Sequence, residues 1–86
     1  MAENSVDSDE ILLRFNRLIG ELLQGRTRRE TFRSWEVELL LDMQNCRIEE
    51  SAREGTLRRY QRAAQRQIEK GAAVPMKLSE FLASKQ

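Results

Sequence analysis

The sequence is poor in residue types on which catalytic and metal sites depend. It contains no histidine and a single cysteine, Cys46, in 86 residues. The absence of histidine removes the usual general base near neutral pH. One thiol can neither close a disulfide within the chain nor supply a thiol-rich zinc site. We therefore expect no catalytic machinery, no metal and no cofactor, and the chain is not expected to be an enzyme.

Motifs for phosphate and calcium are also missing. Neither GxxxxGK[ST] nor GxGxxG occurs, and the segment Asp42-Met43-Gln44-Asn45 lacks the alternating oxygen ligands of an EF-hand. Cys46 falls at the expected C-terminal end of a helix, where the helix dipole disfavours a thiolate. Its spacing continues an apolar stripe, so we interpret it as a buried structural cysteine.

Long apolar runs are absent as well. The longest is Leu39-Leu40-Leu41, far below the roughly 20 residues that cross a bilayer. The amino-terminal sequence MAENSVDSDE is acidic and has no apolar core, unlike a secretory signal. Together with the single cysteine, these features predict a cytoplasmic protein that does not enter a membrane.

What is present indicates helices. Four glycines and one proline leave few breaks in the chain, and a content of 40% hydrophobic residues is too high for a disordered chain. Apolar residues recur with helical spacing. The predicted fold class is all-α: a small three-helix antiparallel bundle with a short C-terminal fourth helix. Residues 7–86 are expected to form this single domain, after a disordered amino terminus over residues 1–6.

The first helix is predicted between Asp7 and Gly25. Asp7 and Glu10 form a capping-box pattern with Asp in place of Ser or Thr, and Gly25 is expected to follow the C-terminal end of the helix. The apolar side chains cover about 140° of arc at 100° per residue. They are Ile11, Leu12, Phe15, Leu18, Ile19, Leu22 and Leu23.

The second helix is predicted from Ser34, as its N-cap, to about Cys46. It is apolar over most of its circumference, and such a helix normally lies at the centre of a fold. The alternative in so short a chain is that it faces a second copy of the protein. The candidate self-association face consists of Val37, Leu40 and Leu41.

Two residues near the start of this helix have both a functional and a structural interpretation. Trp35 is the only tryptophan, and it shares a stripe with Leu39 and Met43, which favours a core anchor over an interface residue. Glu36 lies within the apolar arc. A first-turn acid at the helix rim, in reach of water and paired with an arginine, is favoured over a desolvated functional carboxylate.

The third helix contains the stretch LRRYQRAAQRQIEKG, residues 57–71. Its start is ambiguous, because Ser51 and Thr56 are alternative N-caps, and we place the connection from the second helix at about residues 47–55. Gly71 is expected to end it. Its narrow apolar stripe consists of Leu57, Tyr60, Ala64 and Ile68, and its basic residues lie on the opposite side.

A short fourth helix is predicted from Ser79 to about Ser84. Pro75 keeps the residue before it extended and prevents the third helix from continuing. The apolar residues of this region are expected to form a lid over one end of the three-helix core. They are Val74, Met76, Leu78, Phe81 and Leu82.

Charge alternates along the chain although the net charge is only +1. Residues 1–25 carry −3, residues 26–33 carry +3, residues 34–54 carry −4 and residues 55–86 carry +5. Because short connections favour antiparallel neighbours, the three helices are predicted to run up, down and up, with an acidic floor and a basic roof. The candidate basic surface consists of Arg26, Arg28, Arg29, Arg33, Arg62, Arg66 and Lys70.

These features predict a small non-enzymatic interaction or regulatory module. Its partner is an acidic protein surface or a second copy in a homodimer. The alternative is weak binding of DNA or RNA, with Gln61 or Gln65 near bases. Against it, the connection 47–55 is too long for a helix-turn-helix, and Tyr60 lies on the buried side, away from any stacking platform. A basic face that merely solvates the helix explains the same pattern.

Overall fold

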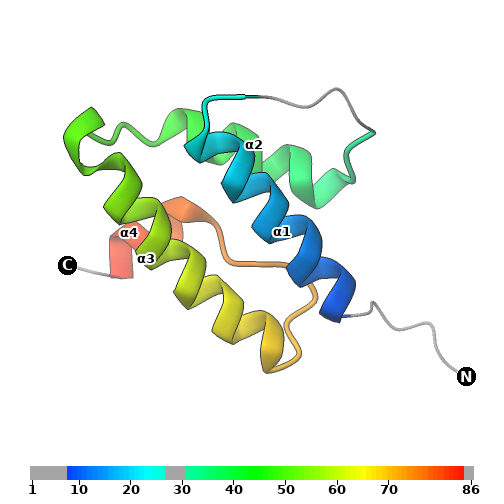
Figure 1. Ribbon diagram of the computed structural model, residues 1–86. Coiled ribbons are helices and arrows are strands. Elements are labelled where there is room, and N and C mark those ends of the chain that lie inside the picture. Colours follow the sequence, from blue (N-terminus) through cyan, green and yellow to red (C-terminus); the bar gives the residue numbers. More distant parts are fainter. Residues whose placement is uncertain (1–7, 27–30, 85–86) are drawn as a thin grey trace, which may run out of the picture.

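The computed structural model describes residues 8–26 and 31–84, and these residues form four helices and no strand (Figure 1). The predicted all-α class, the three-helix bundle and the short fourth helix are confirmed. The expected disorder of residues 1–6 and the cap at Asp7 lie outside the described residues. The helices are α1 (Ser8–Leu23), α2 (Ser34–Asn45), α3 (Glu50–Glu69) and α4 (Leu78–Ser84).

Glycine ends the two long helices, as predicted. Gly25 has a φ of +73°, a left-handed conformation that only glycine adopts without strain. The backbone N–H of Arg26 donates to the carbonyl of Glu21 at 2.9 Å, and that of Gly25 to the carbonyl of Leu22 at 3.1 Å. These are the two hydrogen bonds of a Schellman motif. The same pair of bonds follows α3 at Gly71, where φ is +106°.

The start of α2 differs from the prediction by one residue. Ser34 is the first helical residue and Arg33 is the N-cap. The cap is supplied by Glu36 instead, because its Oε1 accepts the backbone N–H of Arg33 at 2.7 Å. A carboxylate at this position satisfies one of the free N–H groups and meets the positive end of the helix dipole.

The start of α3 is predicted wrongly by a larger margin. The helix begins at Glu50, so neither Ser51 nor Thr56 is its N-cap, and the connection from α2 shortens to residues 46–49. Glu54 and Arg58 form an ion pair at 3.2 Å one turn apart, which supports this first part of the helix. The helix thereby passes through Gly55, at a cost of about 1 kcal/mol relative to alanine.

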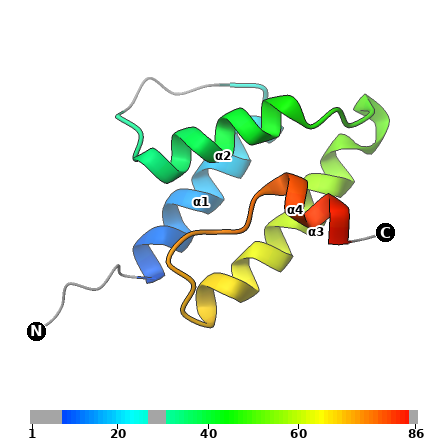
Figure 2. The ribbon, with the colours of Figure 1, turned by 180° about the vertical axis from the view of Figure 1, so that it is seen from behind.

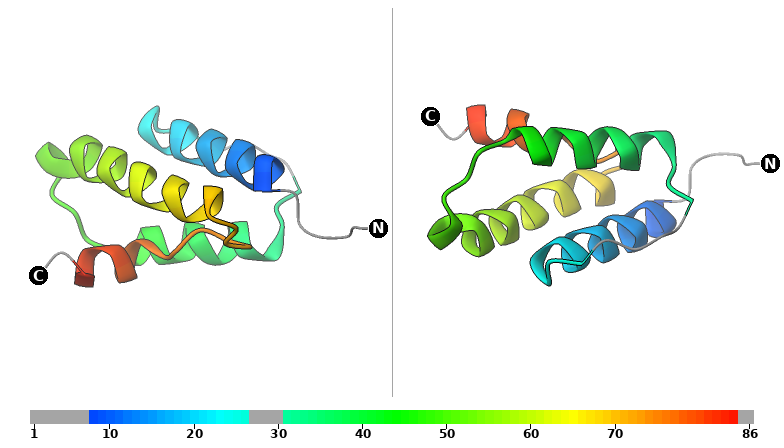
Figure 3. Two further views of the ribbon diagram at one scale, coloured as in Figure 1. Left: turned by 90° about the horizontal axis from the view of Figure 1, so that it is seen from below. Right: turned by 90° about the horizontal axis from the view of Figure 1, so that it is seen from above.

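The helix directions also differ from the prediction. Figures 1 and 3 show α1 and α2 running in the same direction and α3 antiparallel to both. The first residues of α1 and α2 meet, since Arg33 pairs with Glu10 and Glu36 pairs with Arg14. The up-down-up order fails because the connection is not short. The connection, residues 24–33, has ten residues, which reach up to about 33 Å when extended. The 16 residues of α1 span only about 24 Å, so the connection is long enough to return along α1 and start α2 beside the start of α1.

Helix α3, rather than α2, is central. Figure 3 shows α1 and α4 on opposite sides of α3. Tyr60 is fully buried, with ring centroids 5.6 Å from Phe15 and 5.7 Å from Phe81, and its hydroxyl donates to the carbonyl of Met76. The predicted stripe of α3 is confirmed as buried. Helix α2 buries only the side that carries Glu36, Leu39 and Met43.

The chain after α3 returns between α2 and α3 and leads into α4 (Figure 2). Two hydrogen bonds join α4 to α2. The backbone N–H and the hydroxyl of Ser79 donate to the two carboxylate oxygens of Asp42, at 3.0 and 2.7 Å. Leu78 and Phe81 are buried, as the predicted lid requires. Val74 is not part of it: this side chain is 46% exposed.

Candidate functional site

The outer side of α3 carries a line of four cations. Arg59, Arg62, Arg66 and Lys70 follow one another at intervals of three or four residues, which places them on one face. All four are exposed, and together they span about 16 Å along the helix axis. None of them forms an ion pair with any residue of the described ranges. We call this surface the α3 stripe.

Four other arginines of the chain are each matched by a carboxylate. Two of these pairs join α1 to the start of α2, and the other two lie at the end of α1 and within α3. They are Arg14–Glu36, Arg33–Glu10, Arg26–Glu21 and Arg58–Glu54. The cations of the α3 stripe, in contrast, have no ion-pair partner among the described residues, and Glu69 is the one carboxylate beside them on α3.

The predicted basic surface is therefore assembled only in part. Its members on α3, Arg62, Arg66 and Lys70, share the stripe. Arg59 belongs there too, and the regular spacing along α3 is the signal that could have added it to the predicted set. The loop arginines do not join them: Arg26 and Arg33 lie at opposite ends of α1. Arg28 and Arg29 lie outside the described residues.

The acidic floor and the basic roof are not found. Because α1 and α3 are antiparallel, the acidic first turn of α1 lies at the end of the bundle where α3 finishes at Glu69 and Lys70 follows as its C-cap (Figure 1). At that end Glu10 also pairs with Arg33. Arg26 lies at the other end, where α3 begins with Glu50. Each end of the molecule thus mixes both signs, and the row of cations runs along the side of α3.

The candidate self-association face on α2 is partly open to solvent. Val37 is 42% exposed and Leu41 is 55% exposed, one turn apart, whereas Leu40 packs against the core. The 12 residues of α2 include three acids and no basic residue. The exposed side chains favour contact with another apolar surface, while two copies of α2 placed together would repel each other.

Glu36 lies deeper than predicted. It is 3% exposed, because Arg14 reaches across from α1 and covers it. The guanidinium of Arg14 also donates to the carbonyl of Thr31 at 3.4 Å. The predicted arginine partner is confirmed, but the position at the rim is wrong. Oε1 of Glu36 accepts from both Arg14 and the backbone N–H of Arg33, and these contacts hold α1 against the start of α2. We therefore assign Glu36 a structural role.

Cys46 ends α2 and is half-buried rather than buried. Its pKa is raised, first by burial and then by the negative charge of Asp42. A thiol with a raised pKa stays protonated near neutral pH and is a poor nucleophile. The geometry therefore provides no activation of this thiol, in agreement with the structural interpretation.

Among residues 8–26 and 31–84, no group of three potential metal-ligating side chains lies close together. No helix in these ranges combines the length and the apolar character that crossing a membrane requires. No protein-family model matches the chain, and the comparisons with curated proteins and with solved structures give no match either.

Proposed function

We propose that this chain is a small, non-enzymatic, cytoplasmic interaction module that binds an acidic protein surface through the α3 stripe. The observation that carries this proposal is the contrast in charge pairing. Four exposed cations stand in line along α3 with no ion-pair partner in the described part of the chain, while Arg14, Arg26, Arg33 and Arg58 are paired. A row of uncompensated positive charge attracts a negatively charged partner and orients it along the helix.

The energetics favour a transient partner. Exposed ion pairs each contribute about 0.2–1 kcal/mol, so four such contacts give weak affinity. Salt screens them, with a Debye length of about 8 Å at physiological ionic strength. A complex of this kind forms quickly and dissociates quickly, which suits a regulatory contact.

Weak nucleic-acid binding is the second candidate for the same stripe. The connection between α2 and α3 spans residues 46–49, a length found in helix-turn-helix proteins. The length of this connection therefore no longer argues against nucleic-acid binding. Two other observations favour protein. Gln61 donates to Asn16 on α1 at 2.9 Å and so is not free to contact bases. Tyr60 is buried and provides no surface for base stacking.

The double variant Arg62→Glu, Arg66→Glu is expected to weaken binding of a fluorescein-labelled polyglutamate peptide about tenfold or more at low salt. The melting temperature should change little, because both side chains are exposed and unpaired. Fluorescence anisotropy and thermal unfolding measure the two quantities. The matched control is Arg47→Glu, Arg53→Glu, which makes the same charge change at exposed positions off the stripe. If this control weakens binding equally, net charge rather than the stripe is responsible.

The same titration with single- and double-stranded oligonucleotides separates the two candidates. Nucleic acid as the true ligand predicts tighter binding than polyglutamate and a steep salt dependence, with a slope of about −0.9 per phosphate contact on duplex DNA. Polyglutamate binding tighter than that of either oligonucleotide supports an acidic protein. Absence of binding to all three would contradict both candidates.

Self-association through Val37, Leu40 and Leu41 is a further form of interaction that the exposure of α2 supports. The exposed apolar area is small beside the roughly 1,200–2,000 Å² of stable interfaces. We therefore expect association only at high concentration, with a sedimentation mass rising toward twice 10.1 kDa. Leu41→Glu should keep the chain monomeric, whereas Leu13→Glu, at an equally exposed leucine of α1, should not. A mass of 10.1 kDa at every concentration would rule out this face as a dimer contact.

A further inference from the structure

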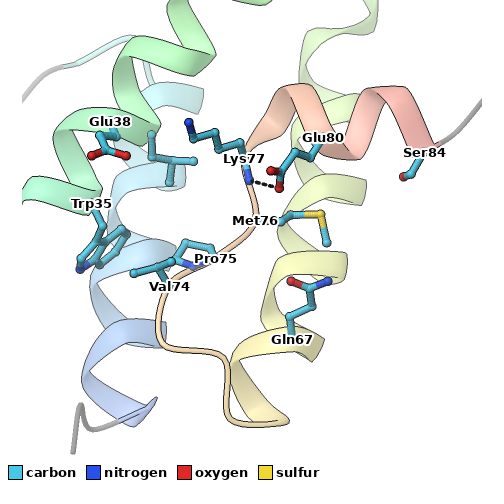
Figure 4. Close-up of a pocket in the computed structure, with 10 residues that line it drawn as sticks. Trp35, Glu38, Gln67, Val74, Pro75, Met76, Lys77, Glu80 and Ser84 are labelled. Atoms are coloured by element: carbon cyan, nitrogen blue, oxygen red, sulfur yellow. Dashed lines mark hydrogen bonds between the residues drawn. The ribbon is translucent and has the colours of Figure 1, made fainter.

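An open groove of about 580 Å³ lies between α2, the end of α3 and the chain leading into α4 (Figure 4). Its volume falls in the range of about 300–1,000 Å³ that is typical of ligand sites. We call it the α2–α4 groove. Apolar side chains line most of it: Trp35, Leu39, Val74, Pro75 and Met76. Its charged residues are Glu38, Lys77 and Glu80.

The apolar end of the groove faces solvent. Figure 4 shows the ring of Trp35 on the same side of the groove as Val74 and Pro75. Trp35 is half-buried and Val74 is 46% exposed, while Pro75 is buried. A buried proline fixes its own backbone and keeps the preceding residue extended. The fold therefore holds Val74 in the open position beside Trp35, and this apolar surface is preformed.

The charges around the groove are mainly negative. Glu38 and Glu80 contribute two carboxylates, against the single ammonium group of Lys77. Helices α2 and α4 contain no lysine or arginine. Nearby, Asp42 already accepts two hydrogen bonds from Ser79, whereas no other residue of the described ranges forms an ion pair with Glu38 or Glu80. Oε1 of Glu80 accepts the backbone N–H of Lys77 at 3.3 Å (Figure 4). A cation entering the groove would find the carboxylate of Glu38 available, together with the second oxygen of Glu80.

We propose that the α2–α4 groove binds a basic amphipathic segment of a partner protein. Its apolar side chains pack against Trp35 and Val74, and a lysine or arginine lies beside Glu38 or Glu80. This is the helix-in-groove mode of recognition, in which apolar contact supplies affinity and charge supplies selectivity. The site is independent of the α3 stripe, since it selects a partner of the opposite charge.

A second copy of the chain fits the groove less well. The α3 stripe would bring positive charge, but its exposed side chains are charged and leave the apolar lining unfilled. The exposed face of α2 would bring Val37 and Leu41, but together with the acids of that helix. Neither surface combines apolar and basic side chains in the way that the lining requires.

Tryptophan fluorescence tests the proposal directly, because Trp35 is the only tryptophan and lines the groove. The probe is a tryptophan-free synthetic helical peptide of leucine and lysine, with the leucines on one face. We expect a saturable blue shift of the Trp35 emission, because leucine side chains replace water around the indole ring. A peptide of the same pattern with glutamate in place of lysine should bind at least about tenfold more weakly.

Two variants with matched controls locate the binding. Val74→Lys should weaken binding about tenfold or more, because its ammonium group would be buried by the peptide and would repel the peptide's cations. Leu13→Lys also introduces a lysine in place of an exposed aliphatic residue, but outside the groove, and should bind like the unaltered protein. Glu38→Gln should weaken binding severalfold and flatten its salt dependence, whereas Glu69→Gln on α3 should do neither.

Several results would overturn the proposal. They are an unchanged emission spectrum with the lysine peptide, equal binding of the glutamate peptide, and equal losses for Leu13→Lys and Val74→Lys. An emission shift that grows with protein concentration in the absence of peptide would show that a second copy fills the groove. The polyglutamate titration of the α3 stripe is a separate measurement, so either proposal can fail without the other.

Discussion

Replacing Glu36 by alanine is expected to destabilise the protein by about 2–3 kcal/mol. The carboxylate is 3% exposed, accepts the backbone N–H of Arg33 at 2.7 Å and pairs with Arg14. The substitution takes away the carboxylate that Arg14 pairs with and the acceptor of the Arg33 N–H at the start of α2, while Arg14 keeps its hydrogen bond to the carbonyl of Thr31. The loss is smaller than for a fully buried pair because the side chain of Arg14 is 22% exposed and regains some hydration. In a domain whose total stability is about 5–15 kcal/mol, this is a large fraction.

Two further variants separate the causes. Glu36→Gln keeps an oxygen that can accept the N–H of Arg33 but removes the charge opposite Arg14, so its loss should be intermediate. Glu38→Ala removes an exposed acid from the same helix and should change the stability by no more than about 0.5 kcal/mol. Urea unfolding followed by circular dichroism gives all three values, provided that the slopes agree. A loss for Glu36→Ala as small as that for Glu38→Ala would show that the pair with Arg14 does not stabilise the fold.

Features set by local spacing could be predicted from the sequence. The buried stripe of α3, from Leu57 to Ile68, follows from helical periodicity alone. Gly25 and Gly71 end their helices because the left-handed conformation is a property of the residue itself. The start of α3 could not be found in this way. The pattern of Ser51 and Glu54 resembles a cap, yet the helix continues on the N-terminal side of it, beginning at Glu50.

Features set by contacts between distant residues could not be predicted. A connection of ten residues permits either direction for α2, and contacts such as Arg14–Glu36, between residues 22 positions apart, accompany the direction that is found. Spacing along one helix was sufficient to identify most of the α3 stripe. The α2–α4 groove was missed because its lining comes from three separate parts of the chain. The sequence pattern alone places Val74 in the lid over one end of the three-helix core.

The protein is expected to lose stability steeply above pH 10, with Tyr60 as the principal cause. Burial raises the pKa of Tyr60 far above its usual range, and the negative charges of Asp42, Glu80 and Cys46 raise it further. In the unfolded chain a tyrosine ionises near pH 10. Above that pH the unfolded state therefore binds fewer protons than the folded state. The free energy of unfolding then falls by about 1.4 kcal/mol per pH unit, and below pH 10 Tyr60 contributes no pH dependence.

The Tyr60→Phe variant isolates this effect, because Tyr60 is the only tyrosine in the chain. Phenylalanine keeps the packing against Phe15 and Phe81 but leaves the carbonyl of Met76 without its donor, so the variant should be about 1–2 kcal/mol less stable near pH 8. It has no phenol to ionise, so its stability should fall less steeply above pH 10 and the two curves should converge. Urea unfolding across this range measures both curves.

A variant at Cys46 shows how much of the loss of stability at alkaline pH comes from the thiol rather than from Tyr60. This thiol also has a raised pKa, so its contribution has the same sign, and a Cys46→Ala variant removes it while retaining Tyr60. The tyrosinate absorbance provides an independent check. If Tyr60 is the cause, this absorbance rises together with the loss of helical circular dichroism, because the phenol ionises only after the core has opened. Parallel stability curves for the unaltered protein and Tyr60→Phe would assign the alkaline instability to other groups.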